Sequence, residues 1–579
     1  MKQTVTPPDM NLDLPDGLEV DVAIVGAGVS GVYSGWRLLA GEYGAGQRPA
    51  SVAVFDMLDR IGGRLESVVL PGMEIAGELG GMRYLTSQEI VTSLIQDVFK
   101  LNACEFPMGD PATHFFYMRG QRFKADAWQN AQQAGETFRT RYFMSDDDQG
   151  FSADQLFNKI IYDVLMADPW FRENYGSKLS HDPSDPWTYE INLTSRDWDA
   201  VKPVVRYHFP GSPYDGMRVN EFGFWNLIED QVGSEGYEFL SVAGGYYSNT
   251  INWNAAESMP NMVGDFTGAA VSYKTIDGGY DQVAFALAQA FVQQPGSALY
   301  GKSELVTFEK LAAGSPRRYR LVFDNNGVGR QVLADSIILA MPRRSLELLD
   351  QENFFFNPQL HPELQDAMAS TIIQPSFKLL MGFEYPWWKQ DFNATAGESI
   401  TDLPMRQCYY FGTDPNDSHS LFLASYNDMR TVPFWAVLEG HPELFEPRGT
   451  AKAALADLER LRTVQATRVM VDEAMQQVRQ LHGMGPDQIP DPYVTWFKDW
   501  SQDPFGGGYH AWDARVDVEN VMKFMRRPFA DEHVHVCGEA YSDQQGWVEG
   551  AFCVAEHMLQ DWYGLEWPSW LNRDYYLGW

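Results

Sequence analysis

Residues Asp21-Val-Ala-Ile-Val-Gly26-Ala-Gly28-Val-Ser-Gly31 decide the fold of this chain. A short apolar run meets three glycines, and the amphipathic stretch Val32 to Leu39 follows, so the pattern predicts a strand, a tight turn and a helix. Gly26 permits the turn, Gly28 lets backbone N–H groups approach a pyrophosphate, and Gly31 lets the helix pack closely on the strand. We interpret this stretch as the start of a dinucleotide-binding unit.

A second apolar run supports that interpretation. Ser51-Val-Ala-Val-Phe55 ends in Asp56, at the place where a dinucleotide fold has the carboxylate that accepts the adenosine ribose hydroxyls. An acid at this place argues against NADP. An incidental acid after a pair of strands is the alternative, but position, strand context and glycine spacing agree with nucleotide binding.

The composition is that of a large, acidic globular protein. The chain has 579 residues, more than one compact domain holds, so we expect two or three domains. Lys and Arg number 44 against 78 Asp and Glu, a formal charge of −34 that would repel phosphate backbones and anionic membranes. We therefore expect neither nucleic acid nor a membrane as a partner.

Neither a metal site nor a disulfide framework is indicated. The cysteines are widely scattered with no CxxC spacing, so buried free thiols are expected: Cys104, Cys408, Cys537 and Cys553. Residues 1–20 are rich in Asp and Pro, and nowhere do eighteen consecutive apolar residues occur. We expect no signal peptide or transmembrane segment in this numbering, and both a cytoplasmic and a secreted location stay open.

Further elements lie far along the chain. The runs at 334–342 and 533–537 have the short, β-branched character of buried strands, so we expect the nucleotide-binding domain to be assembled from separate pieces. Ser152-Ala-Asp-Gln155 has the pattern of a capping box and precedes apolar pairs that repeat every four residues, which predicts a helix. Residues 450–481 predict one or two helices that end at Gly483.

Several motifs together carry a family resemblance. Arg60-Ile-Gly62-Gly63-Arg64 and Glu78-Leu-Gly80-Gly81-Met82-Arg83-Tyr84 set glycine pairs beside arginines, which would approach a pyrophosphate and a flavin ring. Near the other end, Cys537-Gly538-Glu539-Ala540 precedes Gln545-Gly546-Trp547-Val548-Glu549-Gly550-Ala551. With the Asp277-Gly278-Gly279 turn and with Trp500 before a glycine run, these motifs resemble the flavin-dependent amine oxidase family, from about residue 18 to the C-terminus.

The resemblance implies an α/β fold of the amine oxidase type in three parts. A discontinuous, Rossmann-like FAD-binding domain would comprise residues 18–80, 272–345 and 525–565. An α+β substrate-binding domain would comprise 81–135 and 346–500, and an inserted helical domain would comprise 136–271.

The implied cofactor is one noncovalent FAD. The glycine run continues with Gly508 where the monoamine oxidases carry the flavin-linking cysteine, so no covalent link is expected. The expected cofactor contacts lie in the glycine motifs and the segments beside them: Gly26, Ala27, Gly28, Ser30, Gly31, Asp56, Gly63, Arg64, Gly81, Met82, Arg83, Val306, Trp500, Gly538, Glu539, Gly546, Trp547 and Val548.

Within the family, the chain most resembles the L-amino acid oxidases, through Gly80-Gly81-Met82-Arg83 and the stretch from Thr401 to Tyr410. The resemblance implies that Arg83 pairs with the substrate carboxylate and that Tyr409 gives it a hydrogen bond. A buried carboxylate needs a permanently charged planar partner, which arginine provides. Because adjacent strand residues point to opposite faces, only one of Tyr409 and Tyr410 can reach the site, and the residues alone leave that choice open.

Two further residues are assigned catalytic roles. Lys378 lies in an otherwise apolar strand, and family members place such a lysine beside flavin N5, bridged by water, where it assists oxygen reactivity or imine hydrolysis. An edge lysine that reaches solvent is the alternative. Trp547 would wall the substrate cavity, and Trp500 would pack near the flavin. His208 and His510 are interpreted as structural.

The reaction implied is oxidative deamination of an L-amino acid, by hydride transfer from Cα to flavin N5. Dioxygen would reoxidise the flavin to give hydrogen peroxide, and water would convert the imine to a 2-oxo acid and ammonia. The alternatives are an amine or polyamine oxidase, a decarboxylating amino acid monooxygenase, and a non-catalytic FAD-binding sensor. A homodimer or higher homo-oligomer is an expected assembly.

Overall fold

The opening motif folds as a strand, a turn and a helix. In this computed structural model, which describes residues 4–44, 46–263, 272–415, 418–449 and 464–579, β1 (Leu18–Val25) leads through Gly26 into α1 (Val29–Ala40). Gly26 has a φ of +112°. β1 pairs in parallel with β2 (Val52–Phe55), which is the second predicted strand. The predicted strand–turn–helix unit is confirmed.

Distant segments complete a seven-stranded sheet around β1. The order is β12-β2-β1-β15-β14-β13, with β23 paired to β15. β15 contains most of the predicted strand at 334–342, and β23 corresponds to the one at 533–537. The added strands are β12 (Ser297–Tyr300), β13 (Ser303–Lys310), β14 (Tyr319–Asn325), β15 (Val328–Leu339) and β23 (Val534–Val536).

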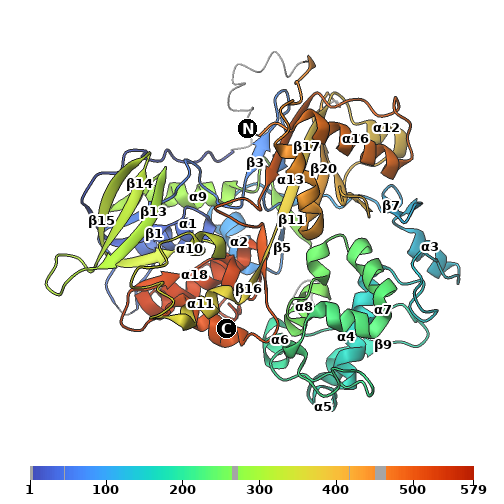
Figure 1. Cartoon of the computed structure of the whole chain (residues 1–579), viewed down its shortest axis with the longest axis horizontal. Coiled ribbons are helices and arrows are strands. Elements are labelled where there is room, and N and C mark those ends of the chain that lie inside the picture. The colour runs from blue at the N-terminus through green and yellow to red at the C-terminus, as the bar shows by residue number, and fades with distance from the viewer. Residues whose placement is uncertain (1–3, 45, 264–271, 416–417, 450–463) are drawn as a thin grey trace.

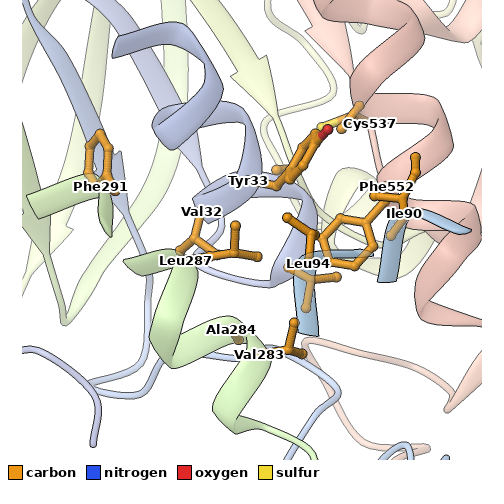
Figure 2. Packing of buried hydrophobic residues seen from close by; sticks show 14 of the residues in the cluster. Val32, Tyr33, Ile90, Leu94, Val283, Ala284, Leu287, Phe291, Cys537 and Phe552 are labelled. Atoms are coloured by element: carbon orange, nitrogen blue, oxygen red, sulfur yellow. The ribbon is translucent and has the colours of Figure 1, made fainter. Parts of the chain in front are cut away.

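Helices cover both faces of this sheet because its parallel strands are apolar on both sides. Along β1, Val22 and Ile24 face one core, whereas Ala23 and Val25 face the other. In the first core, α1 packs against α9 and α18, and Figure 2 shows Tyr33 of α1 beside Phe552 of α18. Besides α1, the helices of the first core are α2 (Glu89–Ser93), α9 (Gln282–Val292) and α18 (Val548–Tyr563). The helices of the second core are α10 (Arg343–Glu347), α11 (Pro362–Ala369) and α17 (Val518–Arg526).

A second seven-stranded sheet has the order β21-β17-β20-β19-β18-β7-β8. Three helices pack on one of its faces: α12 (Trp387–Phe392), α13 (Val432–Glu439) and α16 (Arg468–His482). Its strands are β7 (Phe115–Met118), β8 (Gln121–Lys124), β17 (Ser376–Phe383), β18 (Glu398–Thr401), β19 (Gln407–Thr413), β20 (Ser420–Asp428) and β21 (Val494–Asp499). α16 ends at Gly483, which has a φ of +71°, as predicted. Residues 450–463 of that prediction lie outside the described residues.

A helical region lies beside the second sheet and away from the first (Figure 1). Its main helices are α4 (Ala153–Ala167), α5 (Pro169–Tyr175), α6 (Ser195–Val201), α7 (Phe224–Ala243) and α8 (Ala255–Met262). The predicted capping box at the start of α4 is present, since Ser152 and Gln155 exchange both hydrogen bonds. The region also contains a hairpin, β9 (Leu179–His181) and β10 (Tyr189–Ile191).

Short strands link these bodies and carry the motif residues. β16 (Thr371–Gln374) pairs with β22 (Tyr509–Trp512), and β3 (Ser67–Val69) pairs with β4 (Ala76–Glu78). β11 (Tyr273–Ile276) pairs with β5 (Tyr84–Leu85) and with β6 (Ala103–Glu105). The architecture is α/β, as predicted, while the domain boundaries stay a prediction. In the described part of the chain, no helix combines the length and the apolar character needed to cross a membrane.

Candidate active site

One cavity collects the glycine motifs from both ends of the sequence. Most of the predicted cofactor contacts line it: Gly26, Gly28, Ser30, Asp56, Gly63, Arg64, Gly81, Gly538, Glu539, Gly546, Trp547 and Val548. They meet because β1, β2, β15 and β23 are parallel, so their carboxyl ends lie at the same edge of the sheet. The cavity therefore lies at the edge of the sheet where a dinucleotide fold binds its nucleotide.

The shape of this edge fits a pyrophosphate. α1 has no side-chain cap and no acidic residue in its first turn, which leaves its N-terminal N–H groups for an anion. A Cβ on Gly31 would lie 1.9 Å from the Gly26 carbonyl oxygen, so only glycine allows this close packing of helix on turn. The Asp56 carboxylate accepts hydrogen bonds from the N–H groups of Ala27 (2.7 Å) and Leu58 (2.9 Å), which fixes it beside the glycines.

Several predicted contacts lie elsewhere. Ala27 and Gly31 are packed beneath the turn, and Met82 and Arg83 line the neighbouring cavity. Val306 is 46% exposed on β13, and it is Leu305 that lines the cofactor cavity, because consecutive strand residues point to opposite faces. Trp500 is buried outside both linings, where its indole N–H donates to the Leu79 carbonyl.

The Glu539 carboxylate connects the C-terminal glycine motif to Arg64 of the N-terminal motif. Its carboxylate accepts hydrogen bonds from the backbone N–H of Gly546 (2.8 Å) and from the backbone N–H and Nδ1 of His510 (2.9 Å each), and it lies 2.9 Å from an Arg64 nitrogen. Burial would raise the pKa of Glu539, but the Arg64 guanidinium and His510 lower it to about 2. These contacts hold His510 in place, while it also lines the neighbouring cavity, so its structural role stays a prediction.

A second cavity adjoins the first. The two share Gly81, Tyr509, Gly546, Trp547 and Val548, so they meet at the start of α18. Seven Tyr and Trp residues line the second cavity: Tyr246, Trp253, Tyr273, Tyr280, Tyr426, Tyr509 and Trp547. The predicted wall residue Trp547 lies at the junction and stacks at 6.5 Å from Tyr273. This arrangement provides an aromatic chamber next to the expected flavin end of the nucleotide site.

Arg83 is the cation of this chamber. Its guanidinium carbon lies 4.0 Å from the centre of the Tyr273 ring and 5.2 Å from that of Phe106, and one nitrogen contacts Met108 Sδ at 3.1 Å. Within the described ranges, no carboxylate forms an ion pair with it. Burial works against its charge, but neighbouring groups, Tyr409 first, hold the pKa of Arg83 above its ordinary value. The chamber therefore contains a permanent cation, and the carboxylate of Glu398 is near enough to raise its pKa but forms no ion pair with it among the described residues.

Lys378 lies one layer behind the chamber wall. It is on β17, between β20 and β21, so it is not an edge lysine. Its Nζ donates to the carbonyls of Gly80 (2.6 Å) and Glu78 (3.2 Å), and it lies 4.5 Å from the centre of the Tyr426 ring. Burial lowers the pKa of Lys378 to about 7. The charge of Arg83 also lowers this pKa, whereas the charge of Glu78 raises it.

The two candidate tyrosines of β19 point to opposite faces, as predicted. Tyr410 donates to or accepts from Ser399 and His482 in the core beneath α16. Tyr409 faces the other way but is absent from the lining of the chamber of Arg83, and the whole stretch 409–412 borders a separate cavity. Its hydroxyl donates to Gln407 Oε1 (3.1 Å) and lies 3.4 Å from the hydroxyl of Tyr246. Tyr409 is also the first of the groups that raise the pKa of Arg83, ahead of Tyr246, so both hydroxyls lie near that cation.

Sequence reasoning missed several chamber residues, among them Tyr246, Trp253, Tyr426 and Tyr509. Tyr509 had a local signal, because it directly follows the glycine run at 506–508. The others come from the helical region and from β20, and nothing in the local sequence separates them from core aromatics.

Comparisons with known proteins give the family of the chain. A family profile described as flavin containing amine oxidoreductase matches residues 30–554. Aplysianin-A of Aplysia kurodai is 24% identical, over 94% of this chain and 90% of its own length. L-amino-acid oxidase 4 of Hebeloma cylindrosporum is 22% identical, over 92% of this chain and 79% of its own length. A solved putrescine oxidase variant matches the fold with a TM-score of 0.59, 15% identity and coverage of 94% of this chain and 99% of that one. The chain belongs to the flavin containing amine oxidoreductase family, whose members are flavoproteins with this α/β fold.

Proposed function

We propose that this protein is an FAD-dependent L-amino acid oxidase with noncovalently bound FAD. The family membership makes it a flavin amine oxidoreductase, and the proposal adds the substrate and the reaction. Asp56 beside the glycine turn favours a dinucleotide, and glycine at position 508 favours a noncovalent flavin.

The observation that carries the proposal is Arg83. A guanidinium with no described counter-ion, among aromatic rings, is stabilised when a carboxylate enters and forms two parallel N–H···O bonds. A simple amine would leave that cation without an anion. The amino acid would therefore be held by its carboxylate, with its Cα at the junction of the two cavities.

The other residues act on protons and water. With a lowered pKa, Lys378 is partly neutral near pH 7 and can exchange a proton with a water beside Gly80. Trp547 and Tyr509 wall the junction and exclude bulk water from the reacting carbon.

FAD, when bound, accepts the Cα hydride and passes the electron pair to dioxygen, which with two protons becomes hydrogen peroxide. The substrate nitrogen loses one proton and the resulting imine takes up water, so that a 2-oxo acid and ammonia are released. One amino acid, one dioxygen and one water thus give one 2-oxo acid, one ammonia and one hydrogen peroxide.

A substrate panel tests the proposal. We expect hydrogen peroxide from L-amino acids, and little from D-amino acids or from the matching decarboxylated amines. Equal turnover of the amines would indicate an amine oxidase. An amide product without peroxide would indicate a monooxygenase, and failure of every amino acid to bleach the flavin anaerobically would indicate a sensor.

Arg83→Met should raise KM for amino acids by about a hundredfold or more, because a charged hydrogen-bonded pair is lost from a buried site. The flavin content of the purified variant is the control, since Arg83 lies outside the lining of the cofactor cavity. If the variant loses flavin while KM of the remaining holoenzyme is unchanged, Arg83 serves the cofactor and the proposed substrate class is wrong.

A further inference from the structure

We propose that Tyr246, from the helical region, is the second residue that binds the substrate carboxylate, and that Asp428 positions it. The inference rests on the proposed function, because it assumes a carboxylate at Arg83. Tyr246 lines the chamber that Arg83 lines, whereas Tyr409 is absent from that lining and borders a different cavity. The substrate would then be held between two parts of the fold.

The turn that carries Tyr246 is fixed by β19 from one side. It follows the C-terminus of α7, where Gly245 has a φ of +83°. The fully buried guanidinium of Arg406 donates to the carbonyls of Ser241 (2.9 Å) and Gly245 (3.0 Å), so a cation satisfies the helix C-terminus. Gln407 Nε2 adds a bond of 2.6 Å to the Gly245 carbonyl.

The end of β20 fixes the same turn from the other side. The buried carboxylate of Asp428 accepts the backbone N–H groups of Tyr247 (3.0 Å) and Ser248 (2.8 Å), the two residues that follow Tyr246. It also accepts the hydroxyl of the chamber residue Tyr509 (3.3 Å). The backbone of Tyr246 is therefore held on both sides, and a side chain on a fixed turn loses little entropy when it binds a ligand.

The hydroxyl groups favour Tyr246 over Tyr409 as the donor. Tyr409 uses its proton in the bond to Gln407 Oε1. The hydroxyl of Tyr246 lies 3.4 Å from that of Tyr409, longer than an ordinary O–H···O bond, so its proton can turn toward a carboxylate at little cost. Burial raises the pKa of Tyr246 well above its ordinary value, so it stays a donor through the physiological range.

The test compares Tyr246→Phe with Tyr409→Phe and with Tyr247→Phe as a matched control. Tyr247 is on the same turn but packs against the guanidinium of Arg406 (3.8 Å), outside the chamber lining. We expect Tyr246→Phe to raise KM for an L-amino acid about ten- to hundredfold, the loss of one hydrogen bond to a charged group, with a smaller change in kcat. Tyr247→Phe should leave KM unchanged, and Tyr409→Phe should raise it less than Tyr246→Phe does.

A second measurement distinguishes the loss of carboxylate binding from a general distortion of the site. Inhibition by the decarboxylated amine of the same side chain should be unaffected by Tyr246→Phe, because the amine has no carboxylate. An unchanged KM in Tyr246→Phe, or equal weakening of amine and amino acid, overturns the assignment of Tyr246. Turnover of the amine but not of the amino acid by the wild-type enzyme instead overturns the proposed function itself.

The positioning role of Asp428 has its own test. Asp428→Asn should raise KM in the wild-type background but add little in the Tyr246→Phe background, since it acts through Tyr246. A merely structural residue would raise KM to the same extent in both. Thermal unfolding of both variants is the control, because the loss of stability should be equal in the two backgrounds.

Discussion

At the scale of single residues, burial lowers the pKa of Lys378 and so decides at which pH the lysine can accept a proton. A lysine with a pKa near 7 gains its proton below that pH, so its ability to accept a proton is present above pH 7 and lost as the pH falls through it. We expect kcat to fall about tenfold per pH unit below this point. In Lys378→Met this fall in kcat at low pH should be absent. With a saturating L-amino acid, kcat of the variant at pH 8 should be about a hundredfold lower than that of the wild type. If kcat of Lys378→Met still falls below pH 7, the titrating group is another residue.

The residue scale is also where sequence reasoning was weakest. The resemblance placed Arg83 and Trp547 at the substrate and Lys378 beside the flavin. In the structure Arg83 and Trp547 line the chamber and Lys378 donates to the Gly80 carbonyl, while their roles stay predictions. Tyr409 and Val306 were also expected at the site, but neither lines the predicted cavity, and for Val306 strand alternation turns Leu305 inward instead. That outcome depends on the register and the neighbours, which local sequence does not specify.

At the scale of elements, the glycines of the first turn have separable tasks. Gly31→Ala would put a Cβ into the Gly26 carbonyl, so it should destabilise even the flavin-free protein by about 3 kcal/mol. Gly28→Ala meets no atom closer than 3.8 Å, so it should fold normally and lose flavin affinity, because the pyrophosphate approaches this backbone. Thermal unfolding of the apoproteins and flavin titration distinguish the two. A stable Gly31→Ala apoprotein would contradict the packing role.

At the scale of the whole molecule, buried charges join the helical region to the nucleotide-binding part. Lys202 lies 2.9 Å from Asp199, 2.8 Å from Glu257 and 3.5 Å from Asp543, which is just ahead of α18. Burial raises the pKa of Glu257 to about 7 and that of Asp199 to about 6, despite Lys202. Carboxylates in excess of the lysine thus make this junction depend on pH.

The sign of that dependence follows from the raised pKa of Glu257. Its contribution to stability is full below its unfolded pKa of about 4.5 and is lost as the pH rises through about 7. Glu257→Gln, which cannot ionise, should therefore be more stable than the wild type by about 1–3 kcal/mol at pH 8, and the difference should shrink toward pH 5. Urea unfolding of both proteins at pH 5, 6.5 and 8 measures this difference in the free energy of unfolding. If the difference grows as the pH falls, the raised pKa of Glu257 is wrong.

The sequence by itself determined the parts whose physics is local. The turn at Gly26, the capping box at Ser152 and the C-cap at Gly483 depend on backbone angles and neighbours within a few residues, and all three are present. The buried strands β15 and β23 were predicted for the same reason, since a short β-branched run bounded by turns has few alternatives.

Only the tertiary structure decided which side chains share the chamber. Tyr246 and Tyr426 reach Arg83 because a helical region packs against the end of a distant sheet, and Arg406 and Asp428 fix that contact by hydrogen bonds across more than 150 residues. Such bonds join residues that are unrelated in sequence. Their geometry follows from how whole layers pack, which no periodicity or motif in the chain encodes.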